Sequence, residues 1–314
     1  MVKRGRDDNK GPDNKAYGAV NKAGEVIPSE PIERPAITVP RKERMHVVAW
    51  NLNGMRAFMT KRSGELAALW KAEDVDVLGI TETKITDTEK ATEIEQLVRE
   101  CLKSEKVEFV WSMCKLKKGY SGSLAIIRKS VYDDIKKISF GIKDGVDDPE
   151  GRVITLEFKN DLNIVIAYVP NSGQNLERLS YRTSSWDKDF SKHCCGLKGK
   201  VLVAGDLNVA HRDVDIWNVD APHVPKGAGT TPQERYSFET QLLDKGFVDT
   251  FASMHPDKQG WFTYHSIRAR NKPKNRGLRL DYVLAARATV LDAFITCDYA
   301  ADGDHCPVGV VVHI

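Results

Sequence analysis

Nine short apolar runs, most of them rich in Val and Ile, recur between residue 46 and the C-terminus and limit the folds open to this chain. They are 46–50, 75–80, 108–113, 123–128, 153–158, 163–169, 201–205, 279–284 and 308–313. Their length and β-branched composition predict strands, and several are continuous enough to be buried on both faces of a sheet. Helical patterns lie between them at 64–72, 88–104, 176–193 and 231–245. Strands interspersed with helices predict an α/β body with at least one large sheet.

The segment 231–245 carries the clearest helix boundaries. Thr231 offers an N-cap hydroxyl, Pro232 suits the first helical position and Glu234 completes a capping box. Gly246 follows as a stop signal.

The composition is that of a soluble globular protein. Of the 314 residues, 41% are hydrophobic and 29% charged, which allows one large core or two small ones. The sequence lacks an apolar run of roughly 18 residues and the apolar N-terminal stretch of a secretory signal, so we expect an intracellular protein. Six cysteines without a C-x-x-C pair predict neither a disulfide framework nor a thiolate zinc site, so we expect reduced thiols.

Residues 1–44 differ from the rest of the chain. They hold five of the thirteen prolines and ten Lys or Arg against seven Asp or Glu, so the formal charge of +3 lies in this segment. Weak hydrophobic periodicity predicts a disordered, mildly basic tail, followed by one catalytic domain at 45–314. The start Lys3-Arg4-Gly5-Arg6 is compatible with a nuclear address, a DNA-binding arm or a solvated tail. We expect a nuclear protein, with the mitochondrion as the alternative compartment.

Polar residues interrupt the apolar runs where the strands end. Asp206 and Asn208 follow 201–205 two residues apart, so both side chains project to the same side at the rim of a sheet. Similar placements recur along the chain at Asn51, Asn53, Glu82, Asn171 and Asp304-His305. Asp281 lies inside an apolar run, where an acid must be paired or nearly neutral.

A single polar residue at a strand end is usually a turn former or a helix cap. Six such places in one chain favour a shared site, in which His305 is the imidazole that an acid would orient. Hard oxygen ligands, one His and no thiolates suit Mg²⁺, with Mn²⁺ as a substitute, rather than Zn²⁺. These are the groups that attack of water on a phosphodiester requires.

Nine motifs follow one another in a fixed order along the chain. They are Trp50-Asn-Leu-Asn-Gly-Met-Arg, Glu82-Thr-Lys, Gly119-Tyr-Ser-Gly, Glu150-Gly-Arg, Tyr168-Val-Pro-Asn-Ser-Gly, Gly205-Asp-Leu-Asn-Val-Ala-His, Thr231-Pro-Gln-Glu-Arg, Asn275-Arg-Gly-Leu-Arg-Leu-Asp-Tyr and Asp304-His-Cys-Pro-Val. This series resembles the exonuclease III family of apurinic/apyrimidinic (AP) endonucleases, over the whole body of the chain.

The resemblance implies a four-layered α-β-β-α sandwich of two packed mixed sheets flanked by helices, as in deoxyribonuclease I. It implies a Mg²⁺-dependent DNA-repair endonuclease, a phosphodiester hydrolase that cuts 5′ to abasic sites in base excision repair. The products would be a 3′-hydroxyl and a 5′-deoxyribose phosphate, with 3′→5′ exonuclease or 3′-phosphodiesterase activity on the side. The implied partner is double-stranded DNA with abasic sites or blocked 3′ ends, and we expect a monomer without membrane contact.

The resemblance also assigns residues by position. The catalytic residues would be Tyr168, Asp206, Asn208, Asp281 and His305. The metal ligands, for one ion or two, would be Asn53, Glu82, Asp206, Asn208, Asp304 and His305. Phosphate or DNA contacts would be Asn51, Asn171 and Arg279, and the wall of an abasic-sugar pocket would be Trp261, Leu278 and Leu280.

Within this set, Glu82 would be the principal metal ligand and Asp206 would position and deprotonate the attacking water. Asp281 would orient His305 toward the scissile phosphate, and Tyr168 would help stabilise its developing charge. Tyr168 and Trp261 are also compatible with ordinary core positions.

Three residues depart from the family pattern. Thr81 stands where many members have Gln, Gly303 where Ser usually precedes Asp-His, and Asn53 where some members have Asp. We expect Asn53 to alter metal affinity without abolishing cleavage.

Two other functions remain as alternatives. The same core acts on phosphoinositides or on undamaged DNA in related enzymes, although Arg279 and the Pro170-Asn-Ser-Gly loop favour repair, and we expect no reverse transcriptase. A nucleic-acid-binding module without activity is the other alternative, but such proteins normally lose acids that are present here, namely Glu82, Asp206, Asp281 and Asp304.

Overall fold

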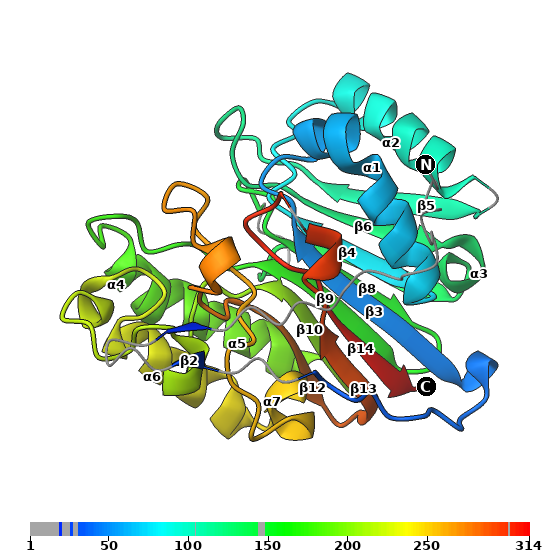
Figure 1. The fold of residues 1–314 in the computed structure, drawn as a ribbon. Helices are drawn as coiled ribbons and strands as arrows, with labels where there is room; N and C mark the ends of the chain where they lie inside the picture. The colour runs from blue at the N-terminus through cyan, green and yellow to red at the C-terminus, as the bar shows by residue number, and fades with distance from the viewer. Residues whose placement is uncertain (1–18, 21–25, 28–30, 104, 144–147, 301) are drawn as a thin grey trace, which may run out of the picture.

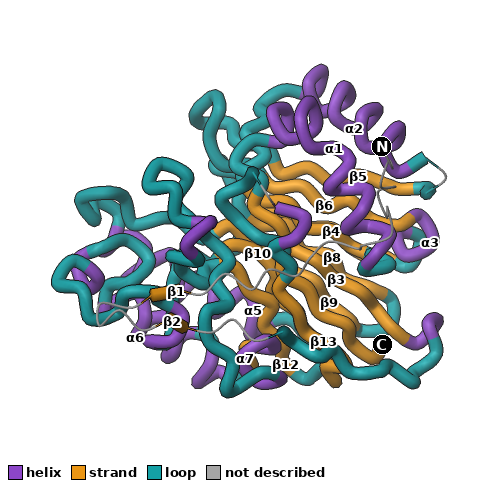
Figure 2. Tube along the Cα trace, in the orientation of Figure 1, coloured by secondary structure: helices purple, strands orange, loops and turns teal. Residues whose placement is uncertain are grey.

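Two six-stranded sheets pack face to face, and helices cover both outer faces (Figures 1 and 2). The computed structural model describes residues 19–20, 26–27, 31–103, 105–143, 148–300 and 302–314. The predicted four-layered α-β-β-α sandwich is therefore confirmed. Among the described residues, no helix combines the length and the apolar composition that a membrane span needs.

Each sheet is mixed, with one parallel pair at its centre and antiparallel pairs on either side. One sheet has the spatial order β11 (Val248–Asp249), β12 (Asp281–Ala286), β10 (Lys200–Asp206), β9 (Leu162–Tyr168), β8 (Val153–Phe158) and β7 (Ile135–Phe140). The other has the order β13 (Thr289–Ile295), β14 (Val308–His313), β3 (Arg44–Asn51), β4 (Val77–Thr81), β6 (Ser123–Arg128) and β5 (Val107–Ser112). The parallel pairs are β9 with β10 and β3 with β4.

The main core lies between the sheets and continues under α1 (Met55–Ala72) and α2 (Thr88–Leu102). The sheets approach closely, because a Cβ added at Gly79 would lie 2.4 Å from Ile166 Cδ1. A second cluster packs the outer face of the β10 sheet against α5 (Asp187–Gly196) and α6 (Pro232–Gln241). Because the central strands are covered on both faces, their sequences are continuous apolar runs.

The structure confirms the predicted start of α6, but the helix ends at Gln241 and the separate 3₁₀ segment η5 (Leu243–Lys245) follows it. Thr231 and Glu234 form the capping box, with Pro232 at the first turn, and Gly246 adopts the left-handed conformation after the last turn. The predicted helix 64–72 is the second half of α1, which is kinked at Arg62. The predicted helix 176–193 is divided into α4 (Leu179–Tyr181), the π-helical segment η2 (Arg182–Trp186) and α5.

The remaining helices are short. They are α3 (Lys129–Tyr132), α7 (Thr250–Met254) and the 3₁₀ segments η1 (Arg41–Glu43), η3 (Asp213–Asp215), η4 (Val224–Lys226), η5 (Leu243–Lys245), η6 (Lys272–Lys274) and η7 (Asp298–Ala300).

The segment 31–43 packs against the body, so the prediction of disorder up to residue 44 does not hold there. Arg34 pairs with Glu73 and Asp292 at 2.6 Å each and lies 4.0 Å from the ring centroid of Phe294. Further toward the N-terminus, β1 (Ala19–Val20) and β2 (Val26–Ile27) form a short antiparallel pair. The basic start at residues 3–6 lies outside the described residues.

Cysteine usage differs from the prediction of six reduced thiols. Cys297 and Cys306 form a disulfide, with a Cα–Cα distance of 4.8 Å. Antiparallel pairing of β13 with β14 places Ile295 opposite Val308 and so brings the two cysteines together. The other four cysteines are free.

Thiol titration of the denatured, unreduced protein should therefore find four reactive groups, and six after reduction. Six thiols before reduction would contradict the pairing.

Candidate active site

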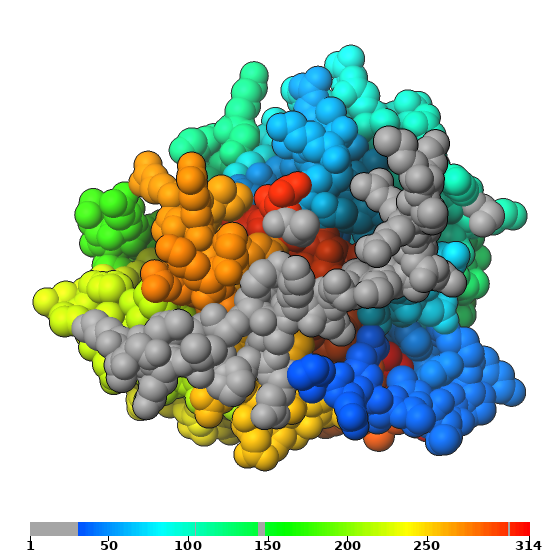
Figure 3. All heavy atoms as spheres, in the orientation of Figure 1, coloured from blue at the N-terminus to red at the C-terminus, as the bar shows by residue number. Residues whose placement is uncertain are grey.

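The predicted site residues gather at one rim of the two facing sheets. Parallel strands end at the same rim, and antiparallel neighbours begin there. Asp206 ends β10 directly opposite Asp281, which begins antiparallel β12. In the other sheet, β3 and β4 end at this rim with Asn51 and Thr81 as partners, and His305 precedes β14. In Figure 3, the residues before β14, drawn in red, reach the surface between an orange loop segment and blue residues of α1.

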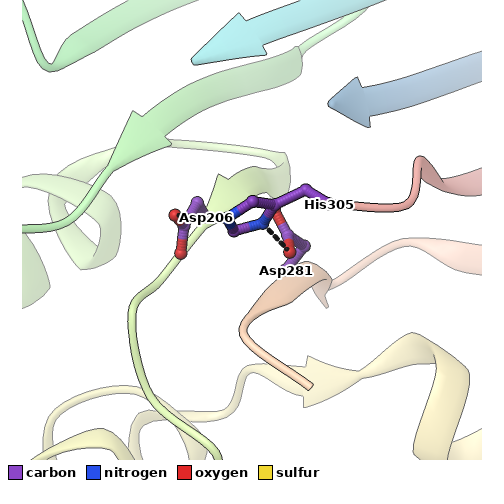
Figure 4. Close-up of side chains that lie close together, drawn as sticks. All are labelled: Asp206, Asp281 and His305. Atoms are coloured by element: carbon purple, nitrogen blue, oxygen red, sulfur yellow. Dashed lines mark hydrogen bonds and ion pairs between the residues drawn. The ribbon is translucent and has the colours of Figure 1, made fainter. Parts of the chain in front are cut away.

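Asp281, His305 and Asp206 form a buried array, shown in Figure 4. His305 Nδ1 lies 2.7 Å from Asp281 Oδ2, and its Nε2 lies 4.0 Å from Asp206 Oδ2. Thr263 fixes the start of β12, since its Oγ1 accepts hydrogen bonds from the backbone N–H groups of Leu280 and Asp281. Each of these side chains is thus oriented before any substrate binds.

The electrostatics of this array suit proton handling. Burial opposes protonation of His305, but the charges of Asp281, Asp206 and Asp304 outweigh it and raise the His305 pKa to about 10. Burial, together with the Asp281 charge, raises the pKa of Asp206 to about 7. A carboxyl with a pKa near neutrality can exchange a proton with water at physiological pH.

Glu82 is held beside this array by two donors. Tyr168 Oη donates to Glu82 Oε1 at 2.7 Å, and Asn51 Nδ2 donates to the same oxygen at 3.1 Å. Asn51 Nδ2 also donates to Asp206 Oδ2 at 2.9 Å, so one buried amide joins the two halves of the site. Burial opposes ionisation of Glu82, but these hydrogen bonds and the charge of Lys84 lower its pKa overall.

Replacing Tyr168 with Phe tests this support of Glu82. We expect incision activity to fall by about 10- to 100-fold, with a higher Mg²⁺ concentration needed for half-maximal rate, because groups that orient a metal ligand have effects of this size. A metal titration of the variant beside the wild type measures both. An unchanged metal requirement would show that Tyr168 does not act through Glu82.

Asn53 and Asp304 extend the site toward solvent. Asn53 Nδ2 donates to Asp304 Oδ2 at 2.8 Å. Lys84, which was not predicted to have a role, donates from Nζ to Asn53 Oδ1 and lies 3.3 Å from Glu82 Oε2. The Lys84 ammonium shows that this oxygen-rich rim accommodates a positive charge.

The predicted metal ligands do not form one cluster. Asp206 and His305 lie in the buried array with Asp281, Asn208 pairs with Asn171, and Asn53, Glu82 and Asp304 lie nearer the solvent. Asp206, Asp281 and His305 have ligand atoms within 4.8 Å of one another, but a protonated His305 donates hydrogen bonds and does not bind a cation. Asn53 is exposed and Glu82 and Asp304 are partly exposed, which fits a hard ion that retains water ligands.

Asn171 and Asn208 form a hydrogen-bonded pair, and Asn208 also contacts Asp206. Asn171 Nδ2 donates to Asn208 Oδ1 at 2.9 Å, and Asn208 Nδ2 donates to the carbonyl of Val169 at 2.9 Å. The backbone N–H of Asn208 donates to Asp206 Oδ1 at 2.8 Å. This contact orients the Asp206 carboxylate.

Arg279, predicted to contact phosphate, is instead a buried structural residue. Its side chain is 1% exposed and donates to Asp215 at 2.9 Å and Asp249 at 2.7 Å. Both carboxylates are themselves buried, so the guanidinium cannot reach DNA without breaking these pairs. The prediction for Arg279 is wrong for this reason.

The predicted pocket residues belong to two different clusters. Leu278 and Leu280 belong to a small cluster that includes Tyr264, whereas the partly buried Trp261 packs against the main core near Phe251. Tyr264 was not predicted as a site residue, yet its ring centroid lies 5.0 Å from that of His305. Its neighbour Thr263 was missed as well, because a hydroxyl that caps a strand carries no distinctive sequence signal.

Two of the three family departures have no clear explanation in the structure. A Cβ added at Gly303 would lie 2.8 Å from Arg62 Nη1, the end of a flexible side chain that can move aside, so this contact does not require glycine. Thr81 is fully buried in β4, and nothing in the structure explains its preference over Gln.

Known proteins match this chain in sequence and in fold. A sequence model of the endonuclease/exonuclease/phosphatase family matches residues 48–305. An exodeoxyribonuclease of Bacillus subtilis is 35% identical over 275 residues, covering 86% of this chain and 100% of the relative. The DNA repair nuclease APEX1 of Danio rerio is 35% identical over 288 residues, covering 90% and 87%. The solved structure of AP endonuclease LMAP from Leishmania major has a TM-score of 0.79 at 28% identity, covering 91% of this chain and 93% of that one.

Proposed function

Because the chain belongs to the endonuclease/exonuclease/phosphatase family, we propose that it is a DNA-repair AP endonuclease. It hydrolyses the phosphodiester 5′ to an abasic site and leaves a 3′-hydroxyl and a 5′-deoxyribose phosphate. One observation above all supports this. The Asn51 amide joins the Glu82 carboxylate to Asp206, so a cation-binding acid and a proton-handling array lie side by side.

Glu82, Asn53 and Asp304 are the residues that would hold Mg²⁺ or Mn²⁺, since their oxygens face the open rim. A hard divalent ion bound there supplies positive charge against the scissile phosphate. Tyr168 and Asn51 keep Glu82 ionised and fixed in place for this task.

Asp206 takes a proton from the attacking water. Its pKa, raised to about 7 by burial and by Asp281, suits a general base at neutral pH. His305, held by Asp281, remains protonated and donates a hydrogen bond to a nonbridging phosphate oxygen as charge develops there. Asn171 and Asn208 supply further amide donors beside the same phosphate.

The substrate panel that tests this proposal contains four phosphate esters in Mg²⁺ or EDTA. They are an abasic duplex, a 3′-blocked duplex, an undamaged duplex and an inositol polyphosphate. In Mg²⁺, we expect the abasic duplex to be cut fastest and the 3′-blocked duplex more slowly. In EDTA, we expect no substrate to be cut. Faster turnover of the inositol phosphate would replace the repair function with a phosphatase function, and metal-independent DNA binding without product would indicate a binding module.

A further inference from the structure

A fully buried ion pair lies beneath two loops of the site. Arg182 opens the π-helical segment η2, and Glu234 lies in the first turn of α6. Arg182 Nη1 lies 3.0 Å from Glu234 Oε1, and the side chains are 2% and 0% exposed. Apolar residues of similar volume can often replace such a pair without loss of stability. Its presence here is therefore better explained by what it holds in place.

Glu234 links the start of α6 to the loop that carries Asn171. Its Oε1 accepts from Ser172 Oγ at 2.5 Å, and Ser172 directly follows Asn171. Its Oε2 accepts from the backbone N–H groups of Gly229 at 2.8 Å and Thr231 at 3.1 Å. A single carboxylate thus fastens the loop after β9 to a rigid helix end.

Arg182 fastens the loop after β10. Nη1 donates to the carbonyl of Asn208 at 2.5 Å, and Nη2 donates to the carbonyl of Leu207 at 2.7 Å. Asn208 has a φ of +50°, in the left-handed region that asparagine adopts more readily than most residues other than glycine. The two bonds from Arg182 fix the backbone of Leu207 and Asn208 in this turn.

The two loops meet at their amides, where Asn171 Nδ2 donates to Asn208 Oδ1. We propose that Arg182 and Glu234 are positioning residues, which set the places of Asn208 and Asn171 beside Asp206. The proposal rests on the proposed function for its effect on cleavage. Neither residue touches the substrate, so their contribution is to the alignment of groups that do.

A double-mutant cycle separates positioning from general stability. Glu234→Gln should lower the single-turnover rate on an abasic duplex by about 100-fold, because small misplacements of reacting groups have effects of this size. The KM for the duplex should stay unchanged. In an Asn171→Ala background, Glu234→Gln should change the rate by less than about threefold, since Glu234 holds the loop that carries Asn171 through Ser172.

Additive effects of the two substitutions would overturn the proposal. A similar loss of rate in Leu242→Ala would also overturn it, because that substitution only destabilises the apolar cluster beneath α5 and α6. If Glu234→Gln fails to fold, Ser172→Ala removes one hydrogen bond without leaving a charge unpaired, and should lower the rate by about tenfold.

Amide hydrogen exchange supplies a readout that does not depend on cleavage. Ser172→Ala and Glu234→Gln should speed exchange in 169–173 and 207–211 more than in β9 or β10. If the substitutions change the exchange rates equally in the two loops and in β9 and β10, or not at all, the proposal is overturned even if the protein cuts DNA. If the wild type leaves abasic duplex intact, the proposed function fails, and the exchange experiment still decides whether the pair orders the two loops.

Discussion

Replacing Asp206 with Asn should lower the single-turnover rate of incision by about 10²- to 10⁴-fold, the range typical of a lost general base. The amide keeps the shape of the side chain, and its oxygen can still accept from the backbone N–H of Asn208. It cannot accept a proton from water. The measurement is a single-turnover time course on an abasic duplex at saturating Mg²⁺.

This substitution should change the stability of the fold little, because it loses the hydrogen bond from Asn51 Nδ2 but also removes a buried charge. The pKa of Asp206 is raised by burial to about 7, above that of the unfolded chain, so the folded state disfavours its ionised form above neutral pH. Removing that charge leaves stability equal or higher at alkaline pH. Asp213→Asn, in which the replaced side chain is 70% exposed, is the matched control and should keep full activity. A rate for Asp206→Asn within about threefold of wild type would exclude the base role.

Replacing Arg279 with Met should destabilise the protein by about 3–5 kcal/mol, because two buried carboxylates lose their partner. Asp215 and Asp249 are both buried, and each lies within 3 Å of the guanidinium, at 2.9 and 2.7 Å. Chemical denaturation of the variant beside the wild type measures the change in the free energy of unfolding.

The matched control is Arg268→Met, which removes an exposed positive charge from the segment between Tyr264 and η6 and should change stability by less than about 0.5 kcal/mol. The two variants distinguish a structural from a DNA-binding role for Arg279. Weaker duplex binding by Arg279→Met, with unchanged stability, would restore the original phosphate-contact prediction.

The strands that carry the site were predictable because they are central. β3, β4, β9 and β10 are covered on both faces, so their apolar runs are unbroken and their polar ends stand out. The edge strands β7 and β13 were not predicted. β7 has two adjacent lysines and no fully buried residue, and the run of β13 contains Asp292, which is buried and pairs with Arg34.

Partners that lie far apart in sequence account for the wrong predictions. Arg279 pairs with Asp215 and Asp249, which lie 64 and 30 residues away in the sequence. No spacing rule predicts ion pairs between residues this far apart. The disulfide was missed because Cys297 follows β13, whose pairing with β14 was unknown. Pocket residues were the hardest to predict, since whether Trp261 faces a cavity or the core depends on packing rather than on pattern.

The central claim is that these converging residues direct water onto the phosphorus 5′ to an abasic site. Single-turnover incision in H₂¹⁸O, followed by mass analysis of both product ends, tests it most directly. We predict one ¹⁸O atom in the 5′-phosphate of the deoxyribose fragment and none in the 3′-hydroxyl. A cut strand whose phosphate carries no ¹⁸O would contradict hydrolysis and indicate cleavage by elimination.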